Sequence, residues 1–310
     1  MKIVITGGMG FVGSHLINNL KNKNEIFVID NFSTNVSSNS NGFEIIEADL
    51  TDSVSLDNIN LESIDILIHL AGPSSGPASA KRPKKTIQES NKITFNILNL
   101  CEKLKVKRFL FSSSMAVYGN PKKSPVNEDS VCEPISFYGI AKLCSEHIIK
   151  TFCINSSFDY SILRFFNIYG PGQDLNRMDQ GIVSIYLSML LKGSPFVIKG
   201  KLDRIRDLIH IDDIVGSTIK ILNSDRAKNQ TINICSGEKI LISYLATTLV
   251  NHFDNYNKDS IIQDEGSLND IHQIYGDNSK LVDDIGYNLK YDIKSGIENF
   301  VKWAKTTKID

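Results

Sequence analysis

Two residues with complementary acid–base chemistry, Tyr138 and Lys142, stand four positions apart near the middle of the chain. In a helix this spacing places both side chains on one face. A tyrosine with an ordinary pKa of about 10 is a poor base near neutrality, but a neighbouring cation stabilises the phenolate and lowers that pKa. Such a pair can move a proton to or from a substrate hydroxyl while a hydride is transferred. Taken alone, the two residues could equally stand together by chance on an exposed helix. A dinucleotide-binding motif elsewhere in the chain would argue against that alternative.

Residues 6–13 form such a motif, because Gly7, Gly10 and Gly13 stand between a short β-branched run and an apolar pattern of helical spacing. Glycines there let the backbone approach a pyrophosphate at the positive end of the helix. Asp30 follows at the end of the second expected strand, where a carboxylate accepts hydrogen bonds from the adenosine ribose hydroxyls. Because a carboxylate repels a 2′-phosphate, the motif favours NAD over NADP. A tight turn without a ligand is the other interpretation, and the surrounding strand, helix and Asp30 argue against it.

The elements that position these groups alternate between apolar runs of strand length and longer helical patterns. Helical patterns include 86–103 and 138–152, and Ser112, Ser113 and Ser114 stand at the end of one expected strand. Continuous apolar strands alternating with helices predict an α/β, doubly wound parallel sheet, the Rossmann fold, which binds ligands at the carboxyl ends of its strands. The expected strands are 3–5, 25–30, 43–48, 65–71, 108–112 and 160–164.

The pattern changes after about residue 166, where glycines and prolines separate shorter elements. We expect an NAD-binding Rossmann domain over residues 1–166, to which 203–223 returns. A smaller, mostly helical and interleaved substrate-binding lobe is expected over 167–310. A chain of 310 residues can form about two domains, or one large α/β unit, with a sizeable core.

Composition limits the possible partners and compartments. Lys plus Arg number 34 and Asp plus Glu 35, so the formal net charge is -1, which argues against a general nucleic-acid binder. The five cysteines form no CxxC pair and the six histidines show no ligand spacing, so we expect packing thiols in a reducing compartment and no metal site. The sequence contains no run of 18 apolar residues, so we expect no membrane-spanning helix. Because the first strand follows Met1 directly, we expect no signal peptide and a cytoplasmic protein.

Together these motifs resemble the extended short-chain dehydrogenase/reductase family, specifically its NAD-dependent nucleotide-sugar epimerases and dehydratases of the UDP-glucose 4-epimerase type. The resemblance covers nearly the whole chain, and the motifs follow one another in the family's order. Besides residues 6–13, the matching segments are 30–34, 48–50, 69–72, 112–119, 138–142, 163–172, 206–213 and 277–280.

The resemblance implies a role for each matching residue, with Ser114, Tyr138 and Lys142 as the catalytic set. Asn167 and Arg206 would contact the diphosphate of the substrate. The structural alternatives are a turn residue for Asn167 and a surface charge for Arg206. The cofactor-binding residues would be Gly7, Gly10, Phe11, Val12, Gly13, Asp30, Asn31, Asp49, Leu50, Leu70, Ala71, Ser112, Tyr138 and Lys142. The substrate-binding residues would be Ser74, Ser114, Asn167, Val183, Arg206 and Asp270.

The reaction is narrowed by the two residues that follow Ser114. In the family's 4,6-dehydratases an Asp-Glu pair there eliminates water, whereas Met115 and Ala116 cannot transfer protons. A 4-epimerase therefore fits best: Tyr138 takes the proton of the C4 hydroxyl, NAD takes the hydride, and hydride returns to the other face of the 4-keto sugar. A nucleotide-sugar 4-dehydrogenase or ketoreductase that releases its product remains open. A non-catalytic NAD-binding regulator is the third hypothesis, and the intact catalytic set argues against it.

Two departures from the family pattern bear on the substrate: Ser267 replaces an arginine common in related epimerases, and the loop 73–77 is unusual. The family also implies a homodimer, in which the helices 86–103 and 138–152 of two subunits form a four-helix interface. Unless they face the sheet instead, the apolar residues of that interface would be Phe95, Leu98, Ile148 and Phe152.

Overall fold

The computed structural model describes residues 1–33, 41–179, 181–265 and 271–307. These residues contain a seven-stranded parallel sheet in the order β11-β6-β5-β4-β1-β2-β3. The chain order reverses between β1 and β4, and a doubly wound sheet binds its ligand at such a point. The doubly wound α/β fold and all six expected strands are therefore confirmed. The strands are β1 (Lys2–Thr6), β2 (Glu25–Asp30), β3 (Glu44–Glu47), β4 (Ile66–His69), β5 (Arg108–Ser114), β6 (Asp159–Phe165) and β11 (Gln230–Ile234).

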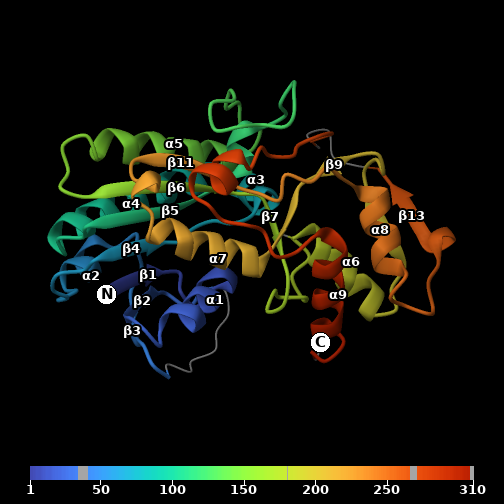
Figure 1. The fold of residues 1–310 in the computed structure, drawn as a ribbon, viewed down its shortest axis with the longest axis horizontal. Coiled ribbons are helices and arrows are strands. Elements are labelled where there is room, and N and C mark those ends of the chain that lie inside the picture. Colours follow the sequence, from blue (N-terminus) through green and yellow to red (C-terminus); the bar gives the residue numbers. More distant parts are fainter. Residues whose placement is uncertain (34–40, 180, 266–270, 308–310) are drawn as a thin grey trace.

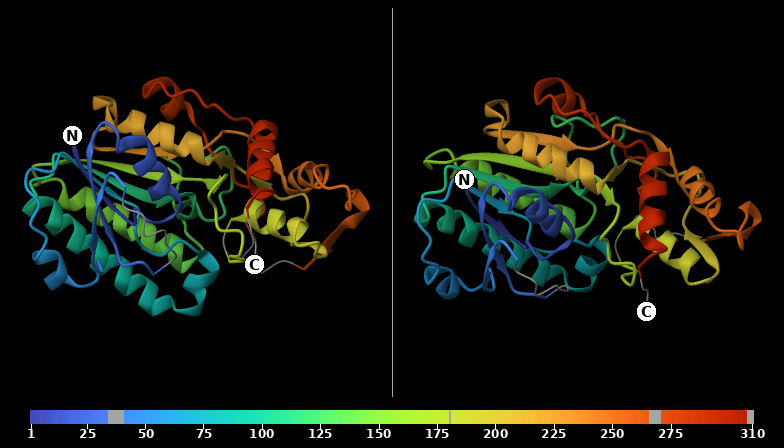
Figure 2. Two further views of the ribbon diagram at one scale, coloured as in Figure 1. Left: turned by 90° about the horizontal axis from the view of Figure 1, so that it is seen from below. Right: turned by 60° about the horizontal axis from the view of Figure 1, so that its bottom comes forward.

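Helices cover both faces of this sheet, as Figures 1 and 2 show. Alternate residues of β1 enter different cores, because successive side chains of a strand point to opposite faces. Ile3 and Ile5 join the apolar core with residues of α1 and α7, whereas Val4 joins the core with residues of α2, α4 and α5. The covering helices are α1 (Phe11–Leu20), α7 (Ile211–Leu222), α2 (Ser53–Asp57), α4 (Pro83–Lys103) and α5 (Phe137–Phe152), with α3 (Gly76–Lys81) beside α5.

The second lobe has its own apolar core and lies beyond the carboxyl ends of the strands (Figure 1). It pairs β8 with β13 in parallel and β9 with β12 in antiparallel orientation. A separate parallel pair, β7 with β10, joins the two lobes. The elements are β7 (Asn167–Tyr169), α6 (Ile182–Leu191), β8 (Phe196–Lys199), β9 (Ile205–Arg206), β10 (Leu208–His210), β12 (Ile240–Leu241), α8 (Ile242–Val250), β13 (Ile261–Asp264) and α9 (Ile293–Ala304). Short turns are η1 (Met115–Tyr118), η2 (Asp225–Ala227), η3 (Lys258–Ser260) and η4 (Lys280–Asp284).

The lobes are interleaved in sequence. The segment 203–223 contributes to both lobes. Its helix α7 packs against α1 of the sheet lobe, whereas its strand β9 pairs with β12 in the second lobe. The strand β11 lies beyond that segment and forms the edge of the large sheet beside β6. The chain therefore crosses between the lobes more than once.

The surface of α4 and α5 differs in one residue from the expectation. Leu98 is fully buried between α4 and the sheet, so its assignment to a subunit interface is wrong. Phe95 points outward and is 48% exposed, while Ile148 and Phe152 are partly buried. Across the described ranges, no helix is long and apolar enough to cross a membrane.

Candidate active site

The turn between β1 and α1 is shaped by its glycines. Gly7 has φ +68°, and a Cβ there would lie 2.7 Å from the backbone nitrogen of Ala71, so the turn contacts the end of β4. A Cβ at Gly13 would lie 2.6 Å from the Gly7 carbonyl oxygen. Gly10 caps α1 without a side-chain hydrogen bond, and the N–H groups of Phe11, Val12 and Gly13 have no acceptor within the helix. These N–H groups fit the diphosphate of NAD.

Asp30 lies at the end of β2 beside this turn. Its Oδ2 accepts a hydrogen bond from the Met9 N–H at 3.0 Å, and its Oδ1 accepts one from the Phe32 N–H at 2.9 Å. The two bonds fix the carboxylate next to the glycine turn. Because an ionised carboxylate has about four acceptor sites, it retains capacity for the hydroxyls of a ribose.

The residues expected at the adenine end follow β3. Asp49 accepts hydrogen bonds from the Thr51 N–H at 2.8 Å and the Thr51 hydroxyl at 2.7 Å. These bonds, with a smaller contribution from Asn31, lower the pKa of Asp49. Leu50 is buried, and its carbonyl accepts a 2.8 Å hydrogen bond from the Asn96 amide. The residues expected to bind the adenosine and diphosphate parts of NAD therefore lie at the carboxyl ends of β1, β2 and β3, and Leu70 and Ala71 follow β4. The other three, Ser112, Tyr138 and Lys142, lie on β5 and α5.

The expected catalytic set is brought together by α5 and β5. Lys142 Nζ donates a 2.7 Å hydrogen bond to the Ser112 carbonyl at the end of β5. The same nitrogen lies 5.9 Å from the centroid of the Tyr138 ring. Ser114, the last residue of β5, lies near enough to Tyr138 to lower the pKa of its phenol. One strand end and one helix face thus supply a hydroxyl, a phenol and an ammonium group.

Burial dominates the titration of Tyr138 and Lys142. It raises the pKa of Tyr138, and only the interaction with Ser114 acts in the opposite direction. The expectation that Lys142 lowers this pKa is therefore wrong. Burial also lowers the pKa of Lys142 to about 8, against the charge of Glu146, which raises it. The ammonium group of Lys142 therefore loses its proton at a lower pH than that of an ordinary lysine.

Three contacts hold the start of α5 in place. A Cβ at Gly139 would lie 2.4 Å from the Ala116 carbonyl oxygen, so only a glycine lets α5 pack this closely on η1. The Ser136 hydroxyl caps the helix by accepting from the Gly139 N–H at 3.0 Å. Ser79 of α3 accepts from the Tyr138 N–H at 3.1 Å. A small pocket adjoins this site, and its lining includes His69, Ala71, Gly72, Phe111, Tyr138 and Lys142.

The expected substrate residues lie where the two lobes meet. The Asn167 amide donates a 2.7 Å hydrogen bond to the carbonyl of Asp207, the residue after Arg206. Arg206 is 8% exposed, and its Nη1 donates to the Ile205 carbonyl. Asn167 and Arg206 are therefore brought close by the β7–β10 pairing.

Two other expected substrate residues, Val183 and Ser74, have very different surroundings. Val183 is 1% exposed within the core of the second lobe. Ser74 is exposed, directly before Ser75, whose hydroxyl caps α3. Asp270 and Ser267 lie outside the described residues.

Sequence reasoning missed the polar groups behind the site. Glu146 is buried one helical turn after Lys142, and Asp207 is buried beside Arg206. The i, i+4 spacing from Lys142 to Glu146 could have indicated a shared helix face. The partner of Glu146, Arg164 on β6, could not be inferred, because the contact depends on how β5 and β6 pair.

The fold and this constellation together define a class of protein. The chain belongs to the NAD dependent epimerase/dehydratase family, which matches residues 3–235. The family expected from the motifs is confirmed, and NAD is its cofactor. The protein is therefore an NAD-dependent enzyme.

Among its relatives, a putative UDP-glucose 4-epimerase of Methanocaldococcus jannaschii is 30% identical over 306 residues, which cover 98% of each chain. The UDP-glucose 4-epimerase of Thermotoga maritima, solved with UDP-glucose, superposes with a TM-score of 0.91 at 27% identity and covers 98% of each chain. The UDP-N-acetylglucosamine 4-epimerase of Methanobrevibacter ruminantium M1, solved with UDP-N-acetylmuramic acid, has a TM-score of 0.89 at 31% identity, covering 98% of this chain and 97% of that one.

Relatives with other reactions also match. They include UDP-glucuronic acid decarboxylase 1 of Danio rerio, of which the chain covers 54%, and a dTDP-D-glucose 4,6-dehydratase of Dictyostelium discoideum, of which it covers 57%. Membership of the family therefore fixes the cofactor but leaves the reaction to be argued from the site.

Proposed function

We propose that the protein is an NAD-dependent nucleotide-sugar 4-epimerase. The observation that carries the proposal is the grouping of Ser114, Tyr138 and Lys142 next to two residues, Met115 and Ala116, that cannot transfer protons. The first three suit the removal and return of a hydroxyl proton. The last two leave no acid or base directly after Ser114 for the elimination of water. Oxidation and reduction at one carbon is the chemistry that remains.

In this proposal the glycine turn and Asp30 hold NAD, which when bound supplies the hydride acceptor and a positively charged ring. Ser114 donates a hydrogen bond to the reacting C4 oxygen, and Tyr138 accepts the C4 hydroxyl proton at its phenolic oxygen and later gives it back. Lys142, as an ammonium ion, orients a ribose through hydrogen bonds. Because no net redox change occurs, epimerisation needs a cofactor that stays bound.

The substrate we propose is a nucleotide diphosphate sugar, as in the three 4-epimerase relatives. Asn167 and Arg206 would hold its diphosphate, where an arginine forms charge-assisted hydrogen bonds. An epimerase must let the 4-keto sugar turn over between the two hydride transfers. Anchoring the substrate through its diphosphate leaves the sugar ring free to do so.

The first test is to incubate the purified protein with UDP-, GDP-, dTDP- and CDP-sugars without added cofactor and to follow each by proton NMR. Growth of a C4 epimer without net formation of NADH would support the proposal and identify the substrate. A stoichiometric rise in NADH with a keto product and no epimer would instead support the 4-dehydrogenase alternative.

The second test replaces the proposed base. Tyr138→Phe should lower kcat by at least about 10²-fold, since general acid–base groups contribute about 10²–10⁴-fold, while NAD stays bound. Tyr244→Phe is the matched control, because that tyrosine is 39% exposed on α8 of the other lobe. Wild-type turnover in Tyr138→Phe would refute the mechanism.

We further propose that the enzyme is a homodimer formed through α4 and α5. The exposed ring of Phe95 on α4 and the partly exposed Ile148 and Phe152 on α5 support this interface. All five cysteines are free and lie in the described part of the chain, which supports our assignment to a reducing, cytoplasmic compartment.

A further inference from the structure

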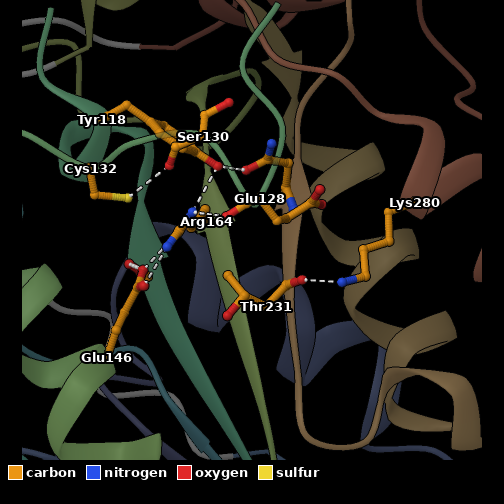
Figure 3. Close-up of polar contacts among 10 residues, drawn as sticks. Tyr118, Glu128, Ser130, Cys132, Glu146, Arg164, Thr231 and Lys280 are labelled. Carbon is orange, nitrogen blue, oxygen red and sulfur yellow. Dashed lines mark hydrogen bonds and ion pairs between the residues drawn. The ribbon is translucent and has the colours of Figure 1, made fainter. Parts of the chain in front are cut away.

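A buried ion pair lies behind the catalytic helix, and the proposed mechanism does not use it. Arg164 of β6 and Glu146 of α5 form two parallel hydrogen bonds, Nε to Oε1 at 3.0 Å and Nη2 to Oε2 at 2.7 Å. Their side chains are 4% and 1% exposed. Figure 3 shows the guanidinium of Arg164 directed at the carboxylate of Glu146. Bidentate contacts of this kind are specific in geometry as well as strong.

The pair is bonded to both sides of Ser114. Before it, the Ser113 hydroxyl donates a hydrogen bond to Glu146 Oε1, and Ser113 lies opposite Arg164 in the register of β5 and β6. After it, η1 ends at Tyr118, whose hydroxyl accepts a 2.9 Å hydrogen bond from Arg164 Nη1 (Figure 3). The strand end and turn that carry Ser114 are therefore fastened to α5 through one ion pair.

Stability alone is a weak explanation for this arrangement. Two charges lose their hydration on burial, and well-packed apolar residues often replace such a pair without loss. The position of Glu146 offers another explanation, because it follows Lys142 by four residues on one helix face. Its charge raises the pKa of Lys142, while burial, the larger effect, lowers it.

Within the described part of the chain, the other groups near Lys142 do not supply a negative charge. On its own helix the nearby ring is that of Tyr138, a phenol whose pKa is raised by burial. From β5 it meets the Ser112 carbonyl and the Phe111 ring, which lies 4.8 Å from Nζ. From β4 it meets His69, which stays neutral because burial lowers its pKa to about 3. Glu146 is thus the carboxylate that acts on this ammonium group.

We propose that Glu146, held in place by Arg164, is a positioning residue that fixes Ser114 against α5 and keeps Lys142 in its ammonium form. The proposal rests on the proposed function in one respect, that Lys142 belongs to the catalytic set. It assigns the ion pair a role in the chemistry of the site in addition to packing.

Glu146→Gln tests the charge. Two readouts are needed: the pH profile of kcat/KM, and the titration of Lys142 itself, read by competitive amine labelling and mass spectrometry on the enzyme as purified. Both should move to lower pH by about half a unit or more, because a nearby opposite charge favours the charged form. An unchanged titration of Lys142 would overturn the proposal.

The matched control is Arg108→Met. Arg108 is a second buried cation of the same sheet, 6% exposed at the other end of β5, where it donates to the Ser224 carbonyl and the Ser161 hydroxyl. Its loss should reduce stability but leave the titration of Lys142 unchanged. An equal shift in Arg108→Met would mean that loosening of the sheet, rather than the charge of Glu146, moves the lysine, and would overturn the proposal.

Two further variants keep the test decisive. If Glu146→Gln does not fold, the double variant Glu146→Leu with Arg164→Met removes both charges together. It should shift the titration of Lys142 in the same direction but by less, because no unpaired Arg164 remains. Ser113→Ala keeps the charge and loses only the tether, so kcat should fall about tenfold while Lys142 titrates as in the wild type. Wild-type kcat in Ser113→Ala would refute the fixing of Ser114.

Failure of this proposal can be told apart from failure of the proposed function. If Tyr138→Phe is inactive but Lys142 titrates identically with and without Glu146, only the role of Glu146 fails. If Lys142 shifts as expected but Tyr138→Phe turns over normally, only the catalytic assignment fails.

Discussion

At the scale of single residues, we expect the pKa of Lys142 to set the pH range in which the proposed site can work. Burial lowers this pKa to about 8, whereas an ordinary lysine titrates near 10.4. The ammonium form is therefore nearly complete below about pH 7 and is lost as the pH rises through 8. We expect kcat/KM to fall along an alkaline limb centred near that value, measured by initial rates between pH 6 and 10.

Lys142→Arg is the control for this limb. A guanidinium stays charged over the whole range, so the limb should disappear even though the rate is lower. A wild-type profile that stays flat up to pH 10 would contradict the assignment.

A second residue-scale prediction concerns Asp30. Replacing it by Ala removes the carboxylate that we expect to hold a ribose of NAD and that orients the Met9 and Phe32 N–H groups. Hydrogen bonds to charged groups contribute about 1.5–3 kcal/mol, so NAD should bind at least about tenfold more weakly in calorimetric titration. Glu25→Ala, at the exposed start of the same strand, should bind NAD normally. Equal affinities in the two variants would exclude Asp30 from the cofactor site.

At the scale of elements, local patterns were sufficient where each element carries its own signal. The continuous apolar strands and the helical spacing at 138–152 predicted β1 to β6 and the helix that bears Tyr138 and Lys142. What could not be predicted depends on contacts between distant segments. Leu98 faces the sheet rather than a partner, and Glu146 meets Arg164 only because β5 and β6 pair in one register. The tilt of a helix and the register of a strand are set by packing, which periodicity does not encode.

The turn between β1 and α1 provides the element-scale prediction. Gly13→Ala would place a Cβ 2.6 Å from the Gly7 carbonyl oxygen and from Gly8 Cα, so α1 must move away from β1. Overpacking of this kind costs about 1–3 kcal/mol, and the displaced helix should also bind NAD less well. Thermal denaturation with and without NAD measures both effects.

Gly76→Ala is the control for that prediction. Gly76 is the first residue of α3. Apart from its chain neighbours and the backbone of its own helix, no described heavy atom would lie within 4 Å of a Cβ there. Its stability should stay unchanged or rise by about 0.4–1 kcal/mol, because alanine reduces the entropy of the unfolded chain. Equal losses in the two variants would mean that steric contact in the turn is not the cause.

At the scale of the whole molecule, the two lobes are joined through a buried carboxylate next to Arg206. Asp207 accepts hydrogen bonds from the N–H groups of Ser236, Gly237 and Gly276 and from the Ser236 hydroxyl. Its own carbonyl accepts from Asn167. Asp207 thereby connects the segment after β11 and the segment before η4 with Asn167 and Arg206, the residues that we expect at the diphosphate. The proposed diphosphate site therefore lies at the junction of the lobes.

The last prediction concerns assembly, at the same scale. If α4 and α5 of two subunits pack together, Phe95 lies at the interface, and its replacement by Lys places a charge in an apolar contact. Light scattering should then give twice the mass of the chain for the wild type and a single chain mass for Phe95→Lys. Ile262→Lys is the matched control, because Ile262 is 50% exposed on β13 of the other lobe and Phe95 is 48% exposed. That variant should remain dimeric. Since each proposed active site is built within one subunit, monomeric Phe95→Lys should keep its turnover if α5 stays folded. A wild type with the mass of a single chain would refute the proposed dimer.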